Sequence, residues 1–231
     1  MLISWVRCIA SFVLFSMACS LASAEPLPQT IKVYSEAWID STNKDGTGYY
    51  WDILRAVFEQ SGSTLSINTT TYKRSVGMVQ TGEADLMVGA YIDEIPNALY
   101  PKWHFDADEV AAVYKKELIS GWQGESSLQG KKVGWVAGYE LANYIPKTYS
   151  AHEHYERDHI FELLNNGKLE IFLDAEYDIR QEMKARNIDE SRYTISPVKT
   201  LKLYFVFADN ERGKLLQKAF DRRFEEMLKS G

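Results

Sequence analysis

The chain has 231 residues, 45% of them hydrophobic and 25% charged, which excludes a fibrous, collagenous or wholly disordered protein. Lys and Arg number 26 against 32 Asp and Glu, so the formal charge is −6 and there is no basic surplus to hold a nucleic-acid backbone or an anionic membrane surface. We therefore expect no nucleic-acid partner.

Residues 1–24 predict a secretory signal peptide. A single charge, Arg7, precedes an apolar run, and the segment ends in the small-residue triplet Ala22–Ala24. The apolar run is short for a membrane span and is followed at once by polar sequence. We therefore expect export to the periplasm, with a mature chain that begins at Glu25.

Both cysteines, Cys8 and Cys19, lie inside this predicted signal peptide. The mature chain then has no thiol, which excludes a cysteine nucleophile and cysteine-ligated metals. Cys19 is a poor site for a lipid anchor because Ser16 stands where a lipoprotein signal has a leucine-like residue. We therefore expect a soluble exported protein.

From Glu25 onward, short apolar strands alternate with helical patterns, which predicts an α/β fold with mainly parallel sheets. In the first half, strands are predicted at 31–35, 64–69 and 85–90, and helices over about 53–61 and 74–81. In the second half, strands are predicted at 132–137 and 169–173, and helices at 139–145, about 160–164 and 175–187. Two half-sized units of similar design thus follow one another.

Two apolar runs, Val110–Tyr114 and Leu201–Ala208, connect these units, and a final helix starts at Glu211. If that helix packs on the first unit, the chain crosses between lobes twice. We therefore predict one lobe from residues 25–112 and 203–231 and an inserted lobe from residues 113–202. A cleft between two hinged lobes is a site that can enclose a small ligand.

Several motifs resemble the family-three extracellular solute-binding proteins, whose best-known members deliver polar amino acids to ABC importers. The resemblance rests on Gly48–Leu54, Gly82–Leu86, Gly130–Gly134 with Ala137-Gly138, and Asn166–Glu170. It implies two α/β lobes joined by two hinge strands, and closure on a ligand by lobe rotation.

The sequence departs from that family at two places. Amino-acid-binding members carry a Thr-x-x-Arg segment, whose Arg pairs with the ligand carboxylate, after the strand equivalent to Asp85–Ala90. The stretch Tyr91–Asn97 has no Arg and two acids instead. Where the family has an Asp for the ligand's amino group, our alignment places Ala175, with Asp174 beside it. A standard α-amino acid is therefore not the expected ligand.

Five aromatic residues are expected to face the cleft, because they follow strands or begin helices where ligands bind in such folds. They are Trp38, Tyr50, Tyr91, Trp135 and Tyr139. For Trp38 the alternative is packing under the loop that follows it. Gly138 is expected to let a backbone amide approach the ligand.

Two charged residues complete the predicted site. Arg74 lies in a helix's first turn, where a cation is unfavourable unless it is exposed or binds an anion, so it is the candidate for an anionic ligand group. Asp174 is a candidate for a cationic or hydroxylated group, and the alternative is that it caps the following helix.

His152, His154 and His159 are too irregularly spaced for a metal site, and the stretch is predicted to be a solvated start of a helix. No catalytic motif or phosphate loop is present, so we expect neither a metal nor a cofactor.

The sequence thus predicts a monomeric periplasmic solute-binding protein, not an enzyme. It is expected to close on a small polar or anionic, possibly ring-containing solute and to present that solute to an ABC importer or a membrane sensor. One alternative is a cleft enzyme of the prephenate or arogenate dehydratase type, with Glu140 or Asp174 as proton donor. Another is a module that binds no ligand and signals by docking alone.

Overall fold

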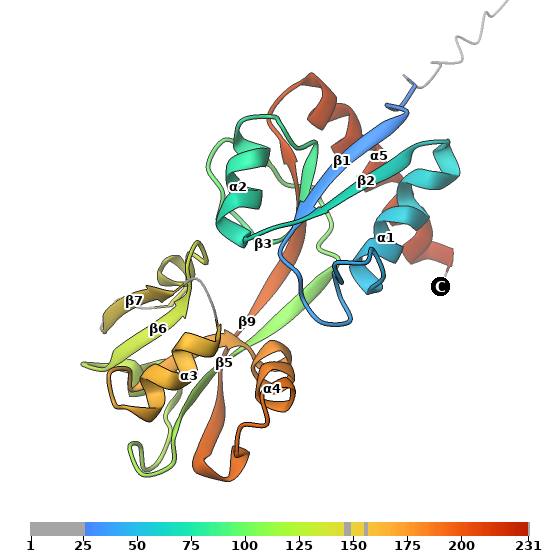
Figure 1. Cartoon of the computed structure of the whole chain (residues 1–231). Helices are drawn as coiled ribbons and strands as arrows, with labels where there is room; N and C mark the ends of the chain where they lie inside the picture. The colour runs from blue at the N-terminus through green and yellow to red at the C-terminus, as the bar shows by residue number, and fades with distance from the viewer. Residues whose placement is uncertain (1–25, 146–148, 155–156, 231) are drawn as a thin grey trace, which may run out of the picture.

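A computed structural model describes residues 26–145, 149–154 and 157–230. The predicted signal peptide lies outside these residues. Within the described part of the chain, no helix has the length and apolar character that a membrane crossing needs. Figure 1 shows an elongated molecule with two lobes, one above and one below two long shared strands.

The first lobe contains a parallel sheet whose middle strand is β1. Its strands are β1 (Thr30–Ser35), β2 (Thr64–Thr69) and β3 (Leu86–Tyr91), with β1 pairing in parallel with both others. Its helices are α1 (Tyr49–Phe58), α2 (Tyr72–Gln80) and the C-terminal α5 (Glu211–Ser230). Strand β3 is buried along its whole length, as expected for a central strand covered on both faces.

The second lobe repeats this design on a smaller scale. Its strands are β6 (Lys132–Val136), β7 (Ser150–His154) and β8 (Ile171–Ala175), and β6 pairs in parallel with both neighbours. Its helices are α3 (Arg157–Asn165) and α4 (Glu176–Ala185).

Two antiparallel strands, β5 (Asp106–Lys115) and β9 (Tyr193–Ala208), join the lobes. Strand β9 pairs with β3 and the short β4 (Ala98–Leu99) of the first lobe, while β5 pairs with β8 of the second, so the strand order is β2-β1-β3-β9-β5-β8-β6-β7. Figure 1 shows both strands passing from one lobe to the other. The predicted lobe boundaries fall inside these shared strands and stay a prediction.

Helix α5 contacts α1 and β9, so the C-terminal helix packs on the first lobe, as the two-crossing hypothesis requires. Its buried face carries Leu216, Phe220 and Phe224, and the Phe220 ring lies edge-on to that of Phe205 in β9. Burial of these side chains stabilises the helix far more than its intrinsic propensity does.

Three local predictions are wrong. Ser150–His154 is strand β7, so His152 and His154 lie in a strand and not at the start of a helix, which begins at Arg157. The helix predicted over 139–145 is a single 3-10 turn at Leu141–Asn143. Strand β8 runs two residues later than predicted, because Asp174 and Ala175 still pair with Ala111 and Val110 of β5.

Candidate ligand-binding cleft

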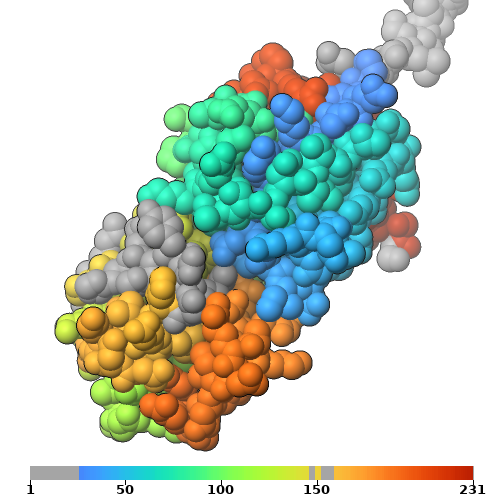
Figure 2. All heavy atoms as spheres, viewed as in Figure 1, coloured from blue at the N-terminus to red at the C-terminus, as the bar shows by residue number. Residues whose placement is uncertain are grey.

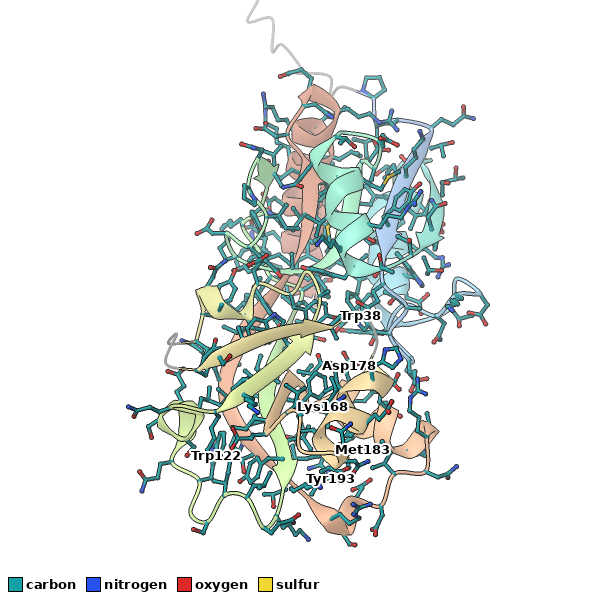
Figure 3. All side chains as sticks on the ribbon, turned by 60° about the vertical axis from the view of Figure 1, so that its left-hand side comes forward. Trp38, Trp122, Lys168, Asp178, Met183 and Tyr193 are labelled. Carbon is teal, nitrogen blue, oxygen red and sulfur yellow. The ribbon has the colours of Figure 1, made fainter. Side chains whose placement is uncertain are left out.

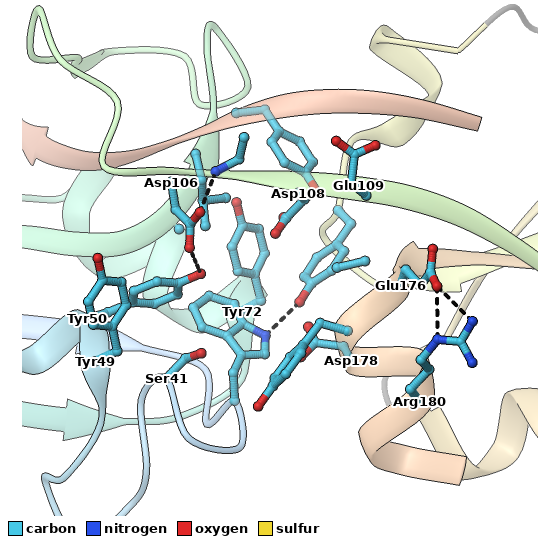
Figure 4. Close-up of a pocket in the computed structure, with 18 of the residues that line it drawn as sticks. Ser41, Tyr49, Tyr50, Tyr72, Asp106, Asp108, Glu109, Glu176, Asp178 and Arg180 are labelled. Atoms are coloured by element: carbon cyan, nitrogen blue, oxygen red, sulfur yellow. Dashed lines mark hydrogen bonds and ion pairs between the residues drawn. The ribbon is translucent and has the colours of Figure 1, made fainter. Parts of the chain in front are cut away.

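A cavity of about 510 Å³ lies between the two lobes, within the usual range of about 300–1,000 Å³ for small-molecule sites. The first lobe contributes Trp38, Ser41, Tyr49, Tyr50, Tyr72, Gly89, Tyr91 and Glu94 to its lining. The joining strands contribute Asp106, Ala107, Asp108, Glu109 and Leu203, and the second lobe Tyr139, Ala175, Glu176, Tyr177, Asp178 and Arg180. The cavity is therefore built from all parts of the two-lobed fold (Figure 4).

Trp38 lies where the lobes meet (Figure 3), with its ring against the backbone of Gly89. A Cβ at Gly89 would lie 2.6 Å from Cη2 of Trp38, and Gly89 has φ +82°, a conformation that favours glycine. The Trp38 indole N–H donates to the Tyr139 hydroxyl of the other lobe at 3.0 Å. A glycine inside a buried strand thus makes room for the indole ring.

The rings of Tyr72 and Tyr139 extend this aromatic wall across the gap between the lobes. They meet edge to face with centroids 4.7 Å apart, and Trp38 lies 6.4 Å from Tyr72. Such rings give a ligand apolar contact, and their faces attract positive charge.

Asp106 and Asp108 lie two residues apart on β5, so their side chains point to the same side of the strand. Figure 4 shows both carboxylates on that side, near the aromatic rings. The Tyr50 hydroxyl donates to Asp106 Oδ2 at 2.9 Å, and the Tyr91 hydroxyl donates to Asp108 Oδ2 at 2.9 Å. Burial, together with these carboxylates, raises the pKa of both tyrosines, so their hydroxyls remain protonated donors.

Glu94 is a buried acid at the edge of the same cavity. Its Oε2 accepts from the Tyr72 hydroxyl and from the Tyr91 backbone N–H, both at 2.8 Å. Its Oε1 accepts from the Glu140 backbone N–H of the second lobe at 3.2 Å. Burial outweighs these hydrogen bonds and raises the pKa of Glu94 to about 7.

Hydrogen bonds across the cleft hold the lobes in a closed arrangement. The Tyr144 hydroxyl donates to the Ile92 carbonyl at 2.7 Å, and the Tyr177 hydroxyl donates to Asp40 Oδ2 at 3.0 Å. In Figure 2 the loop between β1 and α1, in blue, accordingly lies against α4, in orange.

The cavity lining is strongly acidic. Among the described residues it contains six carboxylic acids and one basic side chain, Arg180. The guanidinium of Arg180 pairs with Glu176 at 2.7 Å and with Glu190 at 3.9 Å. Figure 4 shows the pair with Glu176. The field inside the cavity therefore favours a positively charged guest.

Four of the seven residues predicted to form the site line this cavity: Trp38, Tyr50, Tyr91 and Tyr139. The lining does not include Arg74, Trp135 or Asp174. Their predicted roles are therefore not supported by the geometry of the cleft.

Each of these three residues lies elsewhere for a local reason. Arg74 is an exposed residue in the first turn of α2, where its backbone N–H donates to the capping hydroxyl of Thr71. Trp135 lies inside the second lobe, with its ring edge-on to Tyr149. Asp174 is buried within β8 and accepts from the Ala175 backbone N–H, while Ala175 occupies the N-cap position of α4 without a side-chain hydrogen bond to the helix.

Gly138, expected near the ligand, lies instead where the lobes touch. A Cβ there would be 3.1 Å from Cβ of Lys73 in α2. Tyr72, Glu94, Asp106 and Asp108 also line the cavity and were not predicted from the sequence. For the two aspartates a signal was present, because Asp-Ala-Asp-Glu immediately precedes an apolar run, and the alternation of side chains in an extended segment predicts both Asp carboxylates on one side.

No protein-family model and no curated protein matches this chain. Several solved structures, however, match this chain. A substrate-binding protein of an ABC uptake transporter from Streptococcus pneumoniae, solved with bound histidine, is 18% identical with a TM-score of 0.69, and the match covers 88% of each chain. An ancestral arginine-binding protein bound to arginine is 17% identical with a TM-score of 0.70, over 88% of this chain and 94% of that one.

A third match is the arginine-bound form of ArgBP from T. maritima, with 14% identity and a TM-score of 0.67 over 86% of this chain and 96% of that one. These likenesses show the fold. The chain has the two-lobed α/β fold of the substrate-binding proteins of amino-acid ABC transporters, which confirms the fold class predicted from the sequence.

Proposed function

We propose that this chain is a solute-binding protein that closes on a small, positively charged solute and presents it to a transporter or sensor in the membrane. The observation that carries the proposal is the cavity between the lobes, walled by acids and aromatic rings. The similar structures include proteins that are described with bound arginine or histidine, which agrees with a binding role.

A cation gains in two ways from such a cavity. The carboxylates of Asp106 and Asp108 accept charged hydrogen bonds, which are roughly twice as strong as neutral ones. The rings of Trp38 and Tyr72 add cation–π attraction, worth about 0.5–2 kcal/mol for each well-placed ring. Because both lobes line the cavity, the ligand's contacts with the second lobe form only on closure and shift the population toward the closed state.

This proposal replaces the anionic ligand considered from the sequence. That idea depended on Arg74, and Arg74 is not part of the cavity lining. A carboxylate or phosphate group would meet six acids there and one arginine that is already paired. Among the described residues, the charge distribution favours a cation.

Binding to residues 25–231 tests the proposal directly. A ligand that binds only the folded chain raises its melting temperature, so small amines and guanidinium compounds are expected to raise it and small anions are not. Asp106→Asn should weaken binding of an active cation at least tenfold, whereas Asp209→Asn, which removes an exposed acid outside the cavity, serves as the control. Stabilisation by anions alone, or equal loss in both variants, would contradict a cation site.

The expected cellular role belongs to the same proposal. A signal peptide in residues 1–24 would deliver the chain to the periplasm, where an importer or sensor could recognise its closed form. Secretion of a reporter fused after Ala24, compared with a fusion that lacks residues 1–24, checks the export step. Retention of both fusions in the cytoplasm would contradict it.

The dehydratase alternative has one observation in its favour. Glu94 is a buried acid with a pKa raised to about 7 and a place in the cavity lining, as a proton donor requires. The residues first considered for that role fit less well, because Glu140 is exposed and Asp174 is not part of the lining. The substrates of such enzymes are carboxylates, which the acidic lining disfavours. Turnover of prephenate or arogenate that is lost in Glu94→Gln would establish the enzyme.

A further inference from the structure

Building on the proposed function, we propose that the natural ligand is an organic cation without a carboxylate, an amine or guanidinium compound, and that the cleft rejects the corresponding α-amino acids. The inference comes from the charges that surround the cavity. A cation alone and a zwitterion make different demands on a binding site, because the zwitterion's carboxylate also needs a partner once it leaves water.

The lining offers no basic side chain for that purpose among the described residues. Its one arginine, Arg180, is held by two acids, Glu176 of its own helix and Glu190 beyond the helix end. The ion pair between Arg180 and Glu176 is exposed to solvent, so it is weak and breaking it costs little. A ligand carboxylate beside Arg180 would still meet the negative charges of Glu176 and Glu190, which together exceed the single positive charge of the guanidinium, so Arg180 gives it no net attraction.

Backbone N–H groups at helix N-termini are the other common anion binders in proteins. Three helices, α1, α2 and α4, begin at the cavity, because Tyr50, Tyr72 and Glu176 line it. Helices α1 and α4 carry acids in the first turn, namely Asp52 in α1 and both Glu176 and Asp178 in α4, whereas α2 carries none. These carboxylates offset the positive end of the helix dipole in α1 and α4. The start of α2 is covered by the second lobe instead, because a Cβ at Gly138 would lie 3.4 Å from the backbone nitrogen of Lys73. The Tyr72 hydroxyl there is bonded to Glu94.

Three tyrosine hydroxyls of the lining are also committed to the acids of the site. Tyr50 donates to Asp106, Tyr91 to Asp108 and Tyr72 to Glu94, each at 2.8–2.9 Å. Raised tyrosine pKa values keep these protons on the hydroxyls. A ligand carboxylate would have to compete with a protein carboxylate for every one of them, and it would bring a like charge close to that protein carboxylate.

By contrast, an amine or guanidinium finds acceptors that already point into the cavity. Asp106 accepts from the Tyr50 hydroxyl and from the Ala107 backbone N–H, and a carboxylate has about four lone-pair sites, so it retains capacity for a charged N–H. The rest of a small cation can lie against the rings of Trp38, Tyr72 and Tyr139. The cavity is thus complementary to a cationic group on a short, otherwise apolar body.

Matched pairs of ligands that differ only in the carboxylate test this inference by calorimetric titration of residues 25–231. The pairs are cadaverine with lysine, agmatine with arginine, histamine with histidine, and tyramine with tyrosine. In every pair that shows binding, the decarboxylated member is expected to bind at least tenfold more tightly. An amino acid that binds as tightly as its amine overturns the inference and leaves the proposed cation site intact, whereas binding of neither member of any pair contradicts both.

A variant identifies the source of the preference. Asp106→Asn removes one negative charge from the cavity and retains a side-chain oxygen for the Tyr50 hydroxyl. Because an amine carries one more net positive charge than its amino acid, the ratio of the two affinities should fall several-fold in this variant and stay unchanged in Asp209→Asn. A ratio that is the same in Asp106→Asn and the wild-type chain would contradict selection by the acids of the cavity.

Discussion

At the scale of single residues, the cleft couples each important acid to an aromatic hydroxyl. The bonds from Tyr50 to Asp106 and from Tyr91 to Asp108 orient the carboxylates without neutralising them. An ion pair with Lys or Arg would orient them equally well but would cancel the charge that a cationic ligand needs. These two tyrosines therefore line the cavity with their rings and hold the carboxylates in place with their hydroxyl donors.

Glu94 makes ligand binding depend on pH. A bound cation favours the ionised form of a neighbouring acid, so affinity should rise as the pH increases toward about 7 and level off above it, with protons released on binding. Titrations between pH 5 and 8 in buffers of different ionisation enthalpy measure both effects. Glu94→Gln should flatten the pH profile, and an unchanged profile in that variant would assign the titration to another group.

The same raised pKa of Glu94 affects stability without ligand. A folded-state pKa of about 7, above the ordinary 4.5, means that the folded chain binds the proton more tightly than the unfolded chain. The contribution of Glu94 to the free energy of unfolding is therefore fully present below about pH 4.5 and is lost as the pH rises through 7. Denaturant unfolding of the wild type and Glu94→Gln over this range should show the difference in slope.

At the scale of elements, the sequence pattern located most strands and helices because their apolar runs are buried. Strands β2 and β3, for example, lie within one residue of the predicted limits. The pattern fails where pairing continues beyond the apolar residues: β5 begins at Asp106 and β9 at Tyr193, well before their apolar runs. Because the two strands are antiparallel, the polar start of each is held by ladder hydrogen bonds to the later part of the other, which composition does not reveal.

The residues of the candidate site likewise divide into those that could be predicted from the sequence and those that could not. Tyr50 and Tyr91 could be predicted because they stand at the start of a helix and the end of a strand in one lobe. Glu94 could not, because its burial depends on Tyr72 and on a backbone N–H of the other lobe. Contacts between segments that are distant in sequence become visible only once the lobes are placed together.

The turn after β6 is an element whose close approach to the other lobe can be tested. Gly138→Ala would place a methyl group 3.1 Å from Cβ of Lys73 and should hinder closure, reducing ligand affinity several-fold. Gly130→Ala is a matched control, because Gly130 also has a positive φ, +71°, but has no atom within 4 Å of an added Cβ. Both variants carry a backbone strain of about 1–2 kcal/mol.

Comparing the two glycine variants separates strain from contact. Melting temperatures should fall to a similar extent in both, and calorimetric affinity should fall only in Gly138→Ala. Equal affinities in the two variants would mean that the lobes do not approach each other at this turn in the bound state.

At the scale of the whole molecule, two strands join the lobes in the part of the chain that the structure describes, and both are continuous through the junction. Strand β9 pairs with β3 at one end and with β5 along the rest, so bending or twisting of this two-stranded ribbon changes the angle between lobes without breaking either core. The contacts across the cleft are mostly hydrogen bonds of side chains such as Tyr144 and Tyr177. Such contacts favour closure but are individually worth only about 0.5–1.5 kcal/mol, so a ligand can shift the balance.

Distances between labels on the two lobes should therefore shorten when a cation binds. Residues 25–231 contain no cysteine, so Glu83→Cys in the first lobe and Lys184→Cys in the second accept spin labels at these two exposed positions alone. Pulsed electron paramagnetic resonance should show a broader, longer distance distribution without ligand and a shorter, narrower one with it, because bound cation selects the closed state. The pair Glu59→Cys and Glu83→Cys, both in the first lobe, should give one unchanged distance. An inter-lobe distribution that saturating ligand leaves unaltered would show that binding and closure are not linked, and the cavity would then act as a rigid site.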